Sequence, residues 1–468
     1  MGQHNLYKKS YIIKLTNLST KTSLPQGLPV EKEELRIFPI LEAFTKEGFP
    51  TEVAPPHMFK NKWNRFLAVL GPGVFLVGYN IGTGSLTTMA ATGAAYGMTL
   101  VWPLAISCVF TYVLIVAFGR YTAITGKTSL SSFKTHFGKG ITLFVLVSLI
   151  ASEYVSSMGV MAIVTQSVQE WSRPLTRSGE GFDPIWLTII FGGLLYVLFL
   201  NGKYSFFEKI LVIFVSVMGL SFLITSFMVI PDPGEVIRGL VPRIPNESNA
   251  ALLLAGMVGT TMGAVLYVIR SILVQEKGWT ADHLSEEKRD AFISAVLMFV
   301  LSFAIMASAA GTLYVQGRTV ENAIDMMRLL EPFAGRFAIS IFVAGIVSAG
   351  LSSFFPIMLL GPWLLADYKG EKADMHSLPN RLLVLSVVLI SLVVPIFGGR
   401  PVSIMLVSQA LITVATPVIL ILMWRLLNKK EVMGAHTSSR GHNVLMSVII
   451  LFAISMAITG IVGIAGSL

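Results

Sequence analysis

Apolar runs of about twenty residues follow one another along nearly the whole chain beyond residue 63, and they limit its fold more than any other feature. A helix of that length spans the hydrocarbon core of a bilayer. The chain is 54% hydrophobic and 13% charged, which is typical of an all-α, multi-pass membrane protein. The runs predict eleven spans, at 64–91, 97–119, 141–169, 184–201, 205–230, 250–276, 291–316, 335–365, 381–397, 401–427 and 443–467.

The 35 Lys and Arg residues predict how these helices are oriented. With a cytoplasmic N-terminus, sixteen of them fall in inner loops, ten in residues 1–65 and eight in outer loops. Because basic loops stay on the cytoplasmic side, we expect the N-terminus inside, in a bacterial inner membrane. The net charge of +9 then reflects loops that face anionic lipid, and no nucleic-acid partner is expected.

Two predicted spans carry small and polar residues where apolar bulk is expected. Span 64–91 contains Gly82-Thr83-Gly84-Ser85, and span 250–276 contains Gly259-Thr260-Thr261 and Gly263. Glycine weakens a helix and frees backbone groups that lipid cannot satisfy, so such a break usually lines a binding site. The alternative is that small residues only let the helices pack closely.

Each break lies in the first helix of a group of five, and the two breaks are 178 residues apart. Interrupted helices in equivalent positions of two halves are typical of inverted-repeat transporters, which bind their substrate near the midplane of the membrane. We therefore expect a cytoplasmic tail at 1–62, repeats at 63–230 and 250–427, and an eleventh helix at 443–467.

Several segments resemble one known family. The stretch GPGVFLVGYNIGTGSLTTMAATGAAYGMTLVW is similar to the first two helices of the natural-resistance-associated macrophage protein (NRAMP) metal transporters. GRYTAITGK, PDPGEVIRGLVPRIP, RSILVQ and SQALITVATPV are similar to later segments of that family, in the same order. The resemblance runs from about residue 64 to the end and implies a LeuT-like fold of two inverted five-helix repeats plus one helix.

The metal ligands of that family are missing from the matching positions. Its Asp-Pro-Gly-Asn motif aligns with residues 82–85, and its Met-Pro-His motif aligns with Gly263, Ala264 and Val265. Without carboxylate, thioether or imidazole, the site offers carbonyl and hydroxyl oxygens, which match Mn²⁺ or Fe²⁺ poorly. The sequence therefore predicts no metal site.

Neutral donors and acceptors remain at the breaks, beside space that the missing side chains would leave. They would satisfy a polyhydroxylated solute better than a dehydrated divalent ion, unless the hydroxyls bond back to their own helices. We predict proton-coupled symport of a neutral solute, foremost a monosaccharide such as glucose; the alternative is a divalent metal ion of the Mg²⁺ or Mn²⁺ type. The predicted binding residues are Asn80, Gly82, Thr83, Gly84, Ser85, Gly259, Thr260, Thr261, Gly263 and Gln409.

Glu153 is the acidic residue deep inside a predicted span. A carboxyl in the membrane is costly and is a functional hypothesis by default. The resemblance aligns Glu153 with an Asp of the metal transporters' proton route, Arg270 with a sixth-helix His and Arg381 with a ninth-helix Arg. These three residues are the predicted proton-coupling set, and the alternative is a structural Glu153 paired with Arg270 or Arg381.

No enzyme is expected, because none of the seven His lies in a predicted span and no nucleophile and base come together. A channel is disfavoured, because the sequence shows no ring or repeated filter. We expect a monomer without a cofactor, whose partners are a small solute, protons and membrane lipid.

Overall fold

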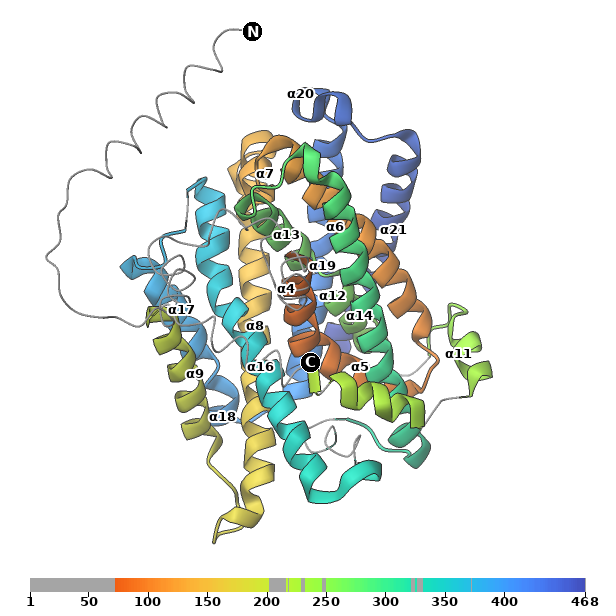
Figure 1. The fold of residues 1–468 in the computed structure, drawn as a ribbon, viewed down its shortest axis with the longest axis vertical. Coiled ribbons are helices and arrows are strands. Elements are labelled where there is room, and N and C mark those ends of the chain that lie inside the picture. Colours follow the sequence, from red (N-terminus) through yellow and green to blue (C-terminus); the bar gives the residue numbers. More distant parts are fainter. Residues whose placement is uncertain are drawn as a thin grey trace, which may run out of the picture. The chain divides into compact units, whose positions relative to one another are not determined.

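The computed structural model describes residues 72–201, 216–217, 219–228, 232–245, 250–320, 325, 331–371 and 373–467, and within them all regular structure is helical. The predicted tail at 1–62 lies outside the described residues. Figure 1 shows the helices in place. In chain order they are α4 (Pro72–Asn80), η3 (Ile81–Ser85), α5 (Leu86–Tyr96), α6 (Val101–Thr125), α7 (Ser129–Phe137), α8 (Lys139–Ser172), η4 (Arg173–Leu175), α9 (Pro184–Asn201), α11 (Pro233–Gly239), α12 (Ala250–Met262), α13 (Ala264–Glu276), η5 (Ala281–His283), α14 (Leu284–Thr312), η6 (Tyr314–Gln316), α16 (Glu331–Lys369), α17 (Leu378–Ile390), α18 (Val393–Phe397), α19 (Pro401–Asn428), α20 (Lys430–Met433), η8 (Gly434–His436) and α21 (Arg440–Ser467).

Eight helices of the described part are long and apolar enough to cross a membrane, or nine if the bent pair Gly219–Met228 and Pro233–Gly239 is one span. The first predicted span appears as the consecutive pieces α4, η3 and α5. The fourth is α9, which is shorter and apolar. Most of the fifth, at 205–230, lies outside the described residues.

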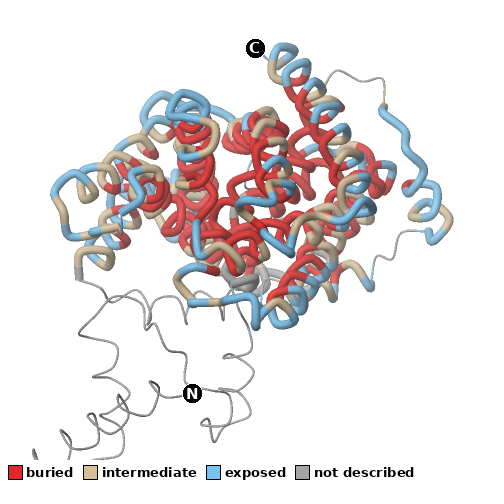
Figure 2. Tube along the Cα trace, turned by 90° about the horizontal axis from the view of Figure 1, so that it is seen from above, coloured by how far each residue is buried: buried red, intermediate tan, exposed pale blue. Residues whose placement is uncertain are grey.

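Buried residues gather in the interior of the helix assembly, and exposed residues lie around it (Figure 2). The most apolar stretch of Ala250–Glu276, which contains α12 and α13, is 100% buried, whereas those of Leu378–Phe397 and Arg440–Gly466 are 28% and 39% buried. A helix that is apolar on all sides is stable only when it is enclosed, or when its outer side faces lipid. The exposed apolar side chains of α21, such as Leu451 and Val462, fit the second case.

Glycines end the helices next to the first break. Gly97 follows α5 with φ 56° and donates its N–H to Gly93 O, and Gly126 follows α6 with φ 66° in the left-handed region. Residues with a Cβ rarely adopt these angles, so glycine lets each helix stop sharply. The chain can then turn into α6 and α7.

Candidate functional site

The first break is a π-helical turn at Ile81–Ser85, between α4 and α5. The flanking residues Asn80 and Leu86 keep right-handed helical angles, so the expected unwound backbone is absent from this described segment. A π-turn holds one extra residue per turn and is frequent at functional sites. The carbonyl of Tyr79, just before the turn, accepts a hydrogen bond from Ser353 Oγ of α16 at 3.3 Å. The side chain of Thr83 lies outside the described residues.

The second break is a true interruption. Helix α12 ends at Met262, and α13 begins at Ala264. Between them Gly263 is extended, with φ −68° and ψ 135°. The predicted break in this span is confirmed. Of the four small residues at which the sequence predicts it, Gly263 is the one that leaves the helix.

Side chains of three other helices satisfy the backbone groups that this break frees. Asn80 Nδ2 of α4 donates to Thr260 O at 2.6 Å, and Thr111 Oγ1 of α6 donates to Thr261 O at 2.6 Å. The N–H of Ala264 donates to Thr416 Oγ1 of α19 at 3.2 Å. Unsatisfied backbone groups are expensive away from water, so these contacts hold the break open.

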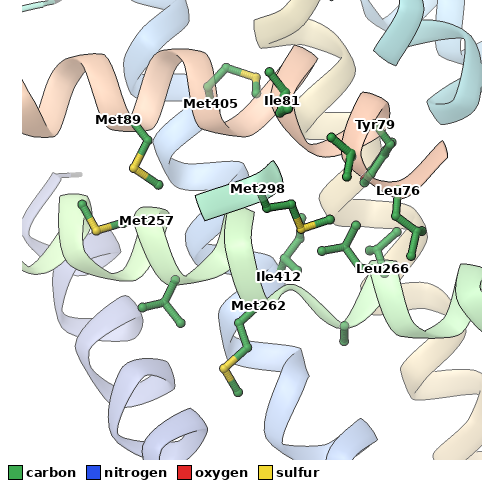
Figure 3. Close-up of a cluster of buried hydrophobic side chains, with 14 of the residues drawn as sticks. Leu76, Tyr79, Ile81, Met89, Met257, Met262, Leu266, Met298, Met405 and Ile412 are labelled. Atoms are coloured by element: carbon green, nitrogen blue, oxygen red, sulfur yellow. The ribbon is translucent and has the colours of Figure 1, made fainter. Parts of the chain in front are cut away.

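Asn80 connects the two breaks. Its Oδ1 accepts from Ser85 Oγ at 2.6 Å and from Thr260 Oγ1 at 3.4 Å, while its Nδ2 bonds Thr260 O. The thioether of Met298, on α14, lies 3.8 Å from the same Nδ2. Figure 3 shows Met298 with Leu266 and Ile412 around the break of α12 and α13. Sequence reasoning missed Met298, because α14 carries no break of its own.

A small cavity lies where the two broken helices meet. It has a volume of about 10 Å³ for the centre of a water-sized sphere, which is room for about one water molecule. Five of the predicted binding residues line it, namely Asn80, Gly259, Thr260, Gly263 and Gln409. Tyr79, Val265, Leu266 and Ile412 complete the lining.

The glycines at the breaks are sites of close packing. A Cβ at Gly82 would lie 2.0 Å from Ser353 Oγ, at Gly84 2.0 Å from Thr260 Oγ1, and at Gly259 1.9 Å from Gln409 O. A Cβ at Gly263 would lie 2.4 Å from Gly259 O. The expectation of open space at these positions is therefore wrong, because neighbouring helices fill it, as small residues in membranes permit.

Two predicted residues point elsewhere. Thr261 Oγ1 donates to Ser107 Oγ of α6 at 2.6 Å and to Met257 O at 2.8 Å. Ser85 is buried beneath Asn80 and orients its amide. Thr261 and Ser85 thus support the breaks but do not line the cavity.

Glu153 lies on α8 next to the cavity lining. Its side chain is 1% exposed, its Oε1 accepts a hydrogen bond from the Tyr79 hydroxyl, and its Oε2 has no partner among the described residues. In the part of the chain that the structure describes, Glu153 forms no ion pair with Arg270 or Arg381. The alternative of a structurally paired Glu153 therefore finds no support in the described contacts.

Arg270 has different partners. Its guanidinium is fully buried and bonds two carboxylates of α14, Glu287 at 3.1 Å and Asp290, beside the ring of Trp279. The Nε of Arg381, on α17, is buried and has no hydrogen-bond partner in the part of the chain that the structure describes. Sequence reasoning missed Glu287 and Asp290, although a buried arginine always calls for a counter-ion.

Among the described residues, no three side chains of His, Cys, Asp or Glu come together as metal ligands. An ion in the cavity would instead meet the amide oxygens of Asn80 and Gln409, the Thr260 hydroxyl and main-chain carbonyls. These are hard, neutral donors.

Comparison with known proteins places the chain in a family. The family model described as natural resistance-associated macrophage protein-like matches residues 73–463. The chain is 23% identical over 406 residues to the divalent metal cation transporter MntH of Deinococcus radiodurans, covering 84% of this chain and 89% of the relative. It is 25% identical over 395 residues to MntH of Nostoc sp., covering 80% and 85%.

Solved structures share the fold. The Eremococcus coleocola manganese transporter in complex with an aromatic bis-isothiourea substituted compound superposes with TM-score 0.67 at 14% identity, covering 88% of both chains. MhsT in complex with L-phenylalanine gives TM-score 0.56 at 12% identity, covering 85% of this chain and 98% of that chain. The predicted fold class, an all-α membrane protein with a LeuT-like inverted repeat, is confirmed.

The prediction of a sugar symporter is wrong. The family model and the relatives named as divalent metal cation transporters overturn it. The physical reason is the size of the cavity at the breaks. Pockets for small organic molecules usually have about 300–1,000 Å³. This cavity has room for about one water, because the glycines are filled by neighbours.

Proposed function

Because the chain belongs to the natural resistance-associated macrophage protein-like family, we propose that it is a secondary transporter of a divalent metal cation of the Mg²⁺ or Mn²⁺ type. The family consists of transporters, so this multi-pass membrane protein is not an enzyme. The cation would bind between η3 and the α12–α13 break.

The observation that carries this proposal is the small, oxygen-lined cavity at the crossing of the two breaks. A single ion that has lost most of its water needs a space of this size and several oxygen atoms at once. Asn80, Thr260 and Gln409 supply oxygens from three different helices. Carbonyl and water oxygens suit Mg²⁺ and Mn²⁺, so this proposal replaces the expectation that such oxygens match Mn²⁺ poorly. Softer metals prefer sulfur and imidazole.

The partial negative charge at the site comes from the backbone as well as from neutral side-chain oxygens. Helix α12 ends at Met262 beside the cavity, and the C-terminal end of a helix carries a partial negative charge. Broken helices of transporters hold cations at such ends. This field supports a cation where the lining itself has no charged side chain.

Protons are the proposed coupling ions, with Glu153 as carrier and Arg270 and Arg381 in supporting roles. Glu153 is separated from the cavity by one side chain, that of Tyr79. We also propose a cytoplasmic N-terminus in a bacterial plasma membrane, a monomer, and repeats at 63–230 and 250–427. The excess of basic residues in the inner loops supports this orientation.

Uptake of Mn²⁺ and Mg²⁺ into proteoliposomes tests the proposed function. We expect concentrative uptake that Gln409→Leu reduces at least about tenfold, because a lost oxygen ligand costs more than 1.4 kcal/mol of binding. The matched control is Gln166→Leu, which changes a half-buried glutamine of α8 outside this cavity. Wild-type protein that takes up neither ion, and that neither ion stabilises against heat, would contradict the proposal.

A further inference from the structure

Tyr79 contacts both the proposed cation cavity and the proposed proton carrier, Glu153. It lines the small cavity, and its hydroxyl donates to Glu153 Oε1 on α8, 74 residues away in the chain. Figure 3 shows its ring at the end of α4, next to Ile81 and near the interrupted stretch of α12 and α13. Among the described residues that line the cavity, Tyr79 is the one that joins it to this carboxyl.

The position of Tyr79 depends on the conformation of the first break. It is the penultimate residue of α4 and precedes the π-turn by one residue. Its carbonyl is bound by Ser353 Oγ at 3.3 Å, which ties this point of α4 to α16. Any change in the π-turn, or in the angle between α4 and α16, would therefore move the hydroxyl relative to Glu153.

In the described part of the chain, the Tyr79 hydroxyl is the donor to Glu153 Oε1, and Oε2 has no partner. The nearest turn of α19 presents the uncharged Met405 and Ser408 to α8, through Ser156 Oγ and Ser152 O. Among the described side chains of helices packed against α8, the charged ones are Lys134, His136, Arg173, Asp367, Lys369, Arg381 and Arg425. None of these seven forms an ion pair with Glu153 in the described structure.

We propose that Tyr79 is the positioning residue that links occupancy of the cavity to protonation of Glu153, an inference that rests on the proposed cation transport. With a cation enclosed, the hydroxyl reaches Oε1 and stabilises the carboxylate, whose proton has left to water. When the first break moves and the cavity opens, the carboxylate loses its donor and takes a proton back from water. One proton is thus exchanged for each change of conformation.

Matched tyrosine variants test this link. Tyr79→Phe removes the hydroxyl and keeps the ring, and Tyr267→Phe does the same at a buried tyrosine of α13 whose hydroxyl bonds Thr111 at 3.0 Å. Proteoliposomes with a pH dye inside report protons moved per Mn²⁺ taken up, a ratio independent of the amount of active protein. We expect Tyr79→Phe to lower the ratio about fivefold or more, and Tyr267→Phe to keep it.

The combination with Glu153→Gln separates coupling from a structural effect. Glu153→Gln alone should lower the ratio equally, and the double variant should lower it no further, because both changes interrupt one link. A Tyr79→Phe protein with the wild-type ratio, or effects that add in the double variant, would overturn the inference. Wild-type Mn²⁺ uptake without proton movement would also overturn it, and would leave only the proposed cation transport standing. Absence of any uptake would remove both the inference and the proposed transport.

A spectroscopic measurement covers the case in which a variant is poorly active. Infrared difference spectra of purified protein, with and without Mn²⁺, should show loss of a protonated carboxyl band in wild type. The band should be absent in Glu153→Gln and unresponsive to Mn²⁺ in Tyr79→Phe. A band in Tyr79→Phe that responds as in wild type would refute the role of the hydroxyl.

Discussion

Replacing Arg270 by Met should be the most destabilising single change in the described interior. Arg270 is fully buried and bonds Glu287 and Asp290, of which Glu287 is also fully buried. Removing the guanidinium leaves Glu287 and Asp290 without the cation that bonds both carboxylates. Breaking a buried pair in this way costs about 3–5 kcal/mol, a large share of a typical folding free energy of about 5–15 kcal/mol.

Unfolding in detergent, followed by denaturant titration, measures this loss. The matched control is Arg238→Met, because Arg238 is 76% exposed and lies 3.9 Å from Asp232. An exposed pair of this kind contributes about 0–1 kcal/mol. The double variant Arg270→Met/Glu287→Met should recover most of the loss, since apolar replacement of a whole buried pair is often neutral.

Two outcomes would refute this reasoning. If Arg270→Met unfolds within about 1 kcal/mol of wild type, the ion cluster is not a stabilising unit. If Arg270→Met folds normally but moves fewer protons per cation, Arg270 acts in coupling as the sequence predicted. The stability and the flux measurements together therefore distinguish a structural arginine from a functional one.

Two further predictions follow from the packing of the breaks. Gly259→Ala should lower stability by about 1–3 kcal/mol and abolish uptake, because its Cβ would lie 1.9 Å from Gln409 O. The control in the same thermal-unfolding and uptake assays is Gly193→Ala on α9, whose Cβ would have no atom within 4 Å. Equal behaviour of the two variants would contradict the packing role of Gly259. Thr416→Val should cost about 1–3 kcal/mol, because the buried N–H of Ala264 loses its acceptor at 3.2 Å; protection of the Ala264 amide against hydrogen exchange should fall, and unchanged protection would refute the contact.

The sequence predicted the class of protein and the interruption of span 250–276 because both depend on local patterns. Apolar runs and the small residues at Gly259–Gly263 are visible without knowing what lies beside them. The partners of these residues are not visible. Tyr79 and Glu153 are 74 residues apart, and Asn80 and Thr260 are 180 apart, so only the packing of helices brings them together.

The acidic cluster on α14 shows a second limit. The predicted span began at residue 291, which left Glu287 and Asp290 in a loop, whereas α14 begins at Leu284 and carries both into the interior. The signal that could have found them was Arg270 inside a span, because a charge there needs a partner. Its spacing from α14 could not be read from the sequence alone.

The sugar prediction rested on counting charged ligands at the breaks themselves, and the structure shows why that count is a weak guide to the substrate. A missing side chain leaves no space when a residue of a neighbouring helix packs against the glycine. Ser353 packs against Gly82 in this way, and Thr260 packs against Gly84. Negative charge need not border the cavity either. Under the proposed function it is held one side chain away, at Glu153 behind Tyr79, and the end of α12 adds its partial charge. A cation can then be attracted to neutral oxygens, and its field reaches an acid that exchanges a proton.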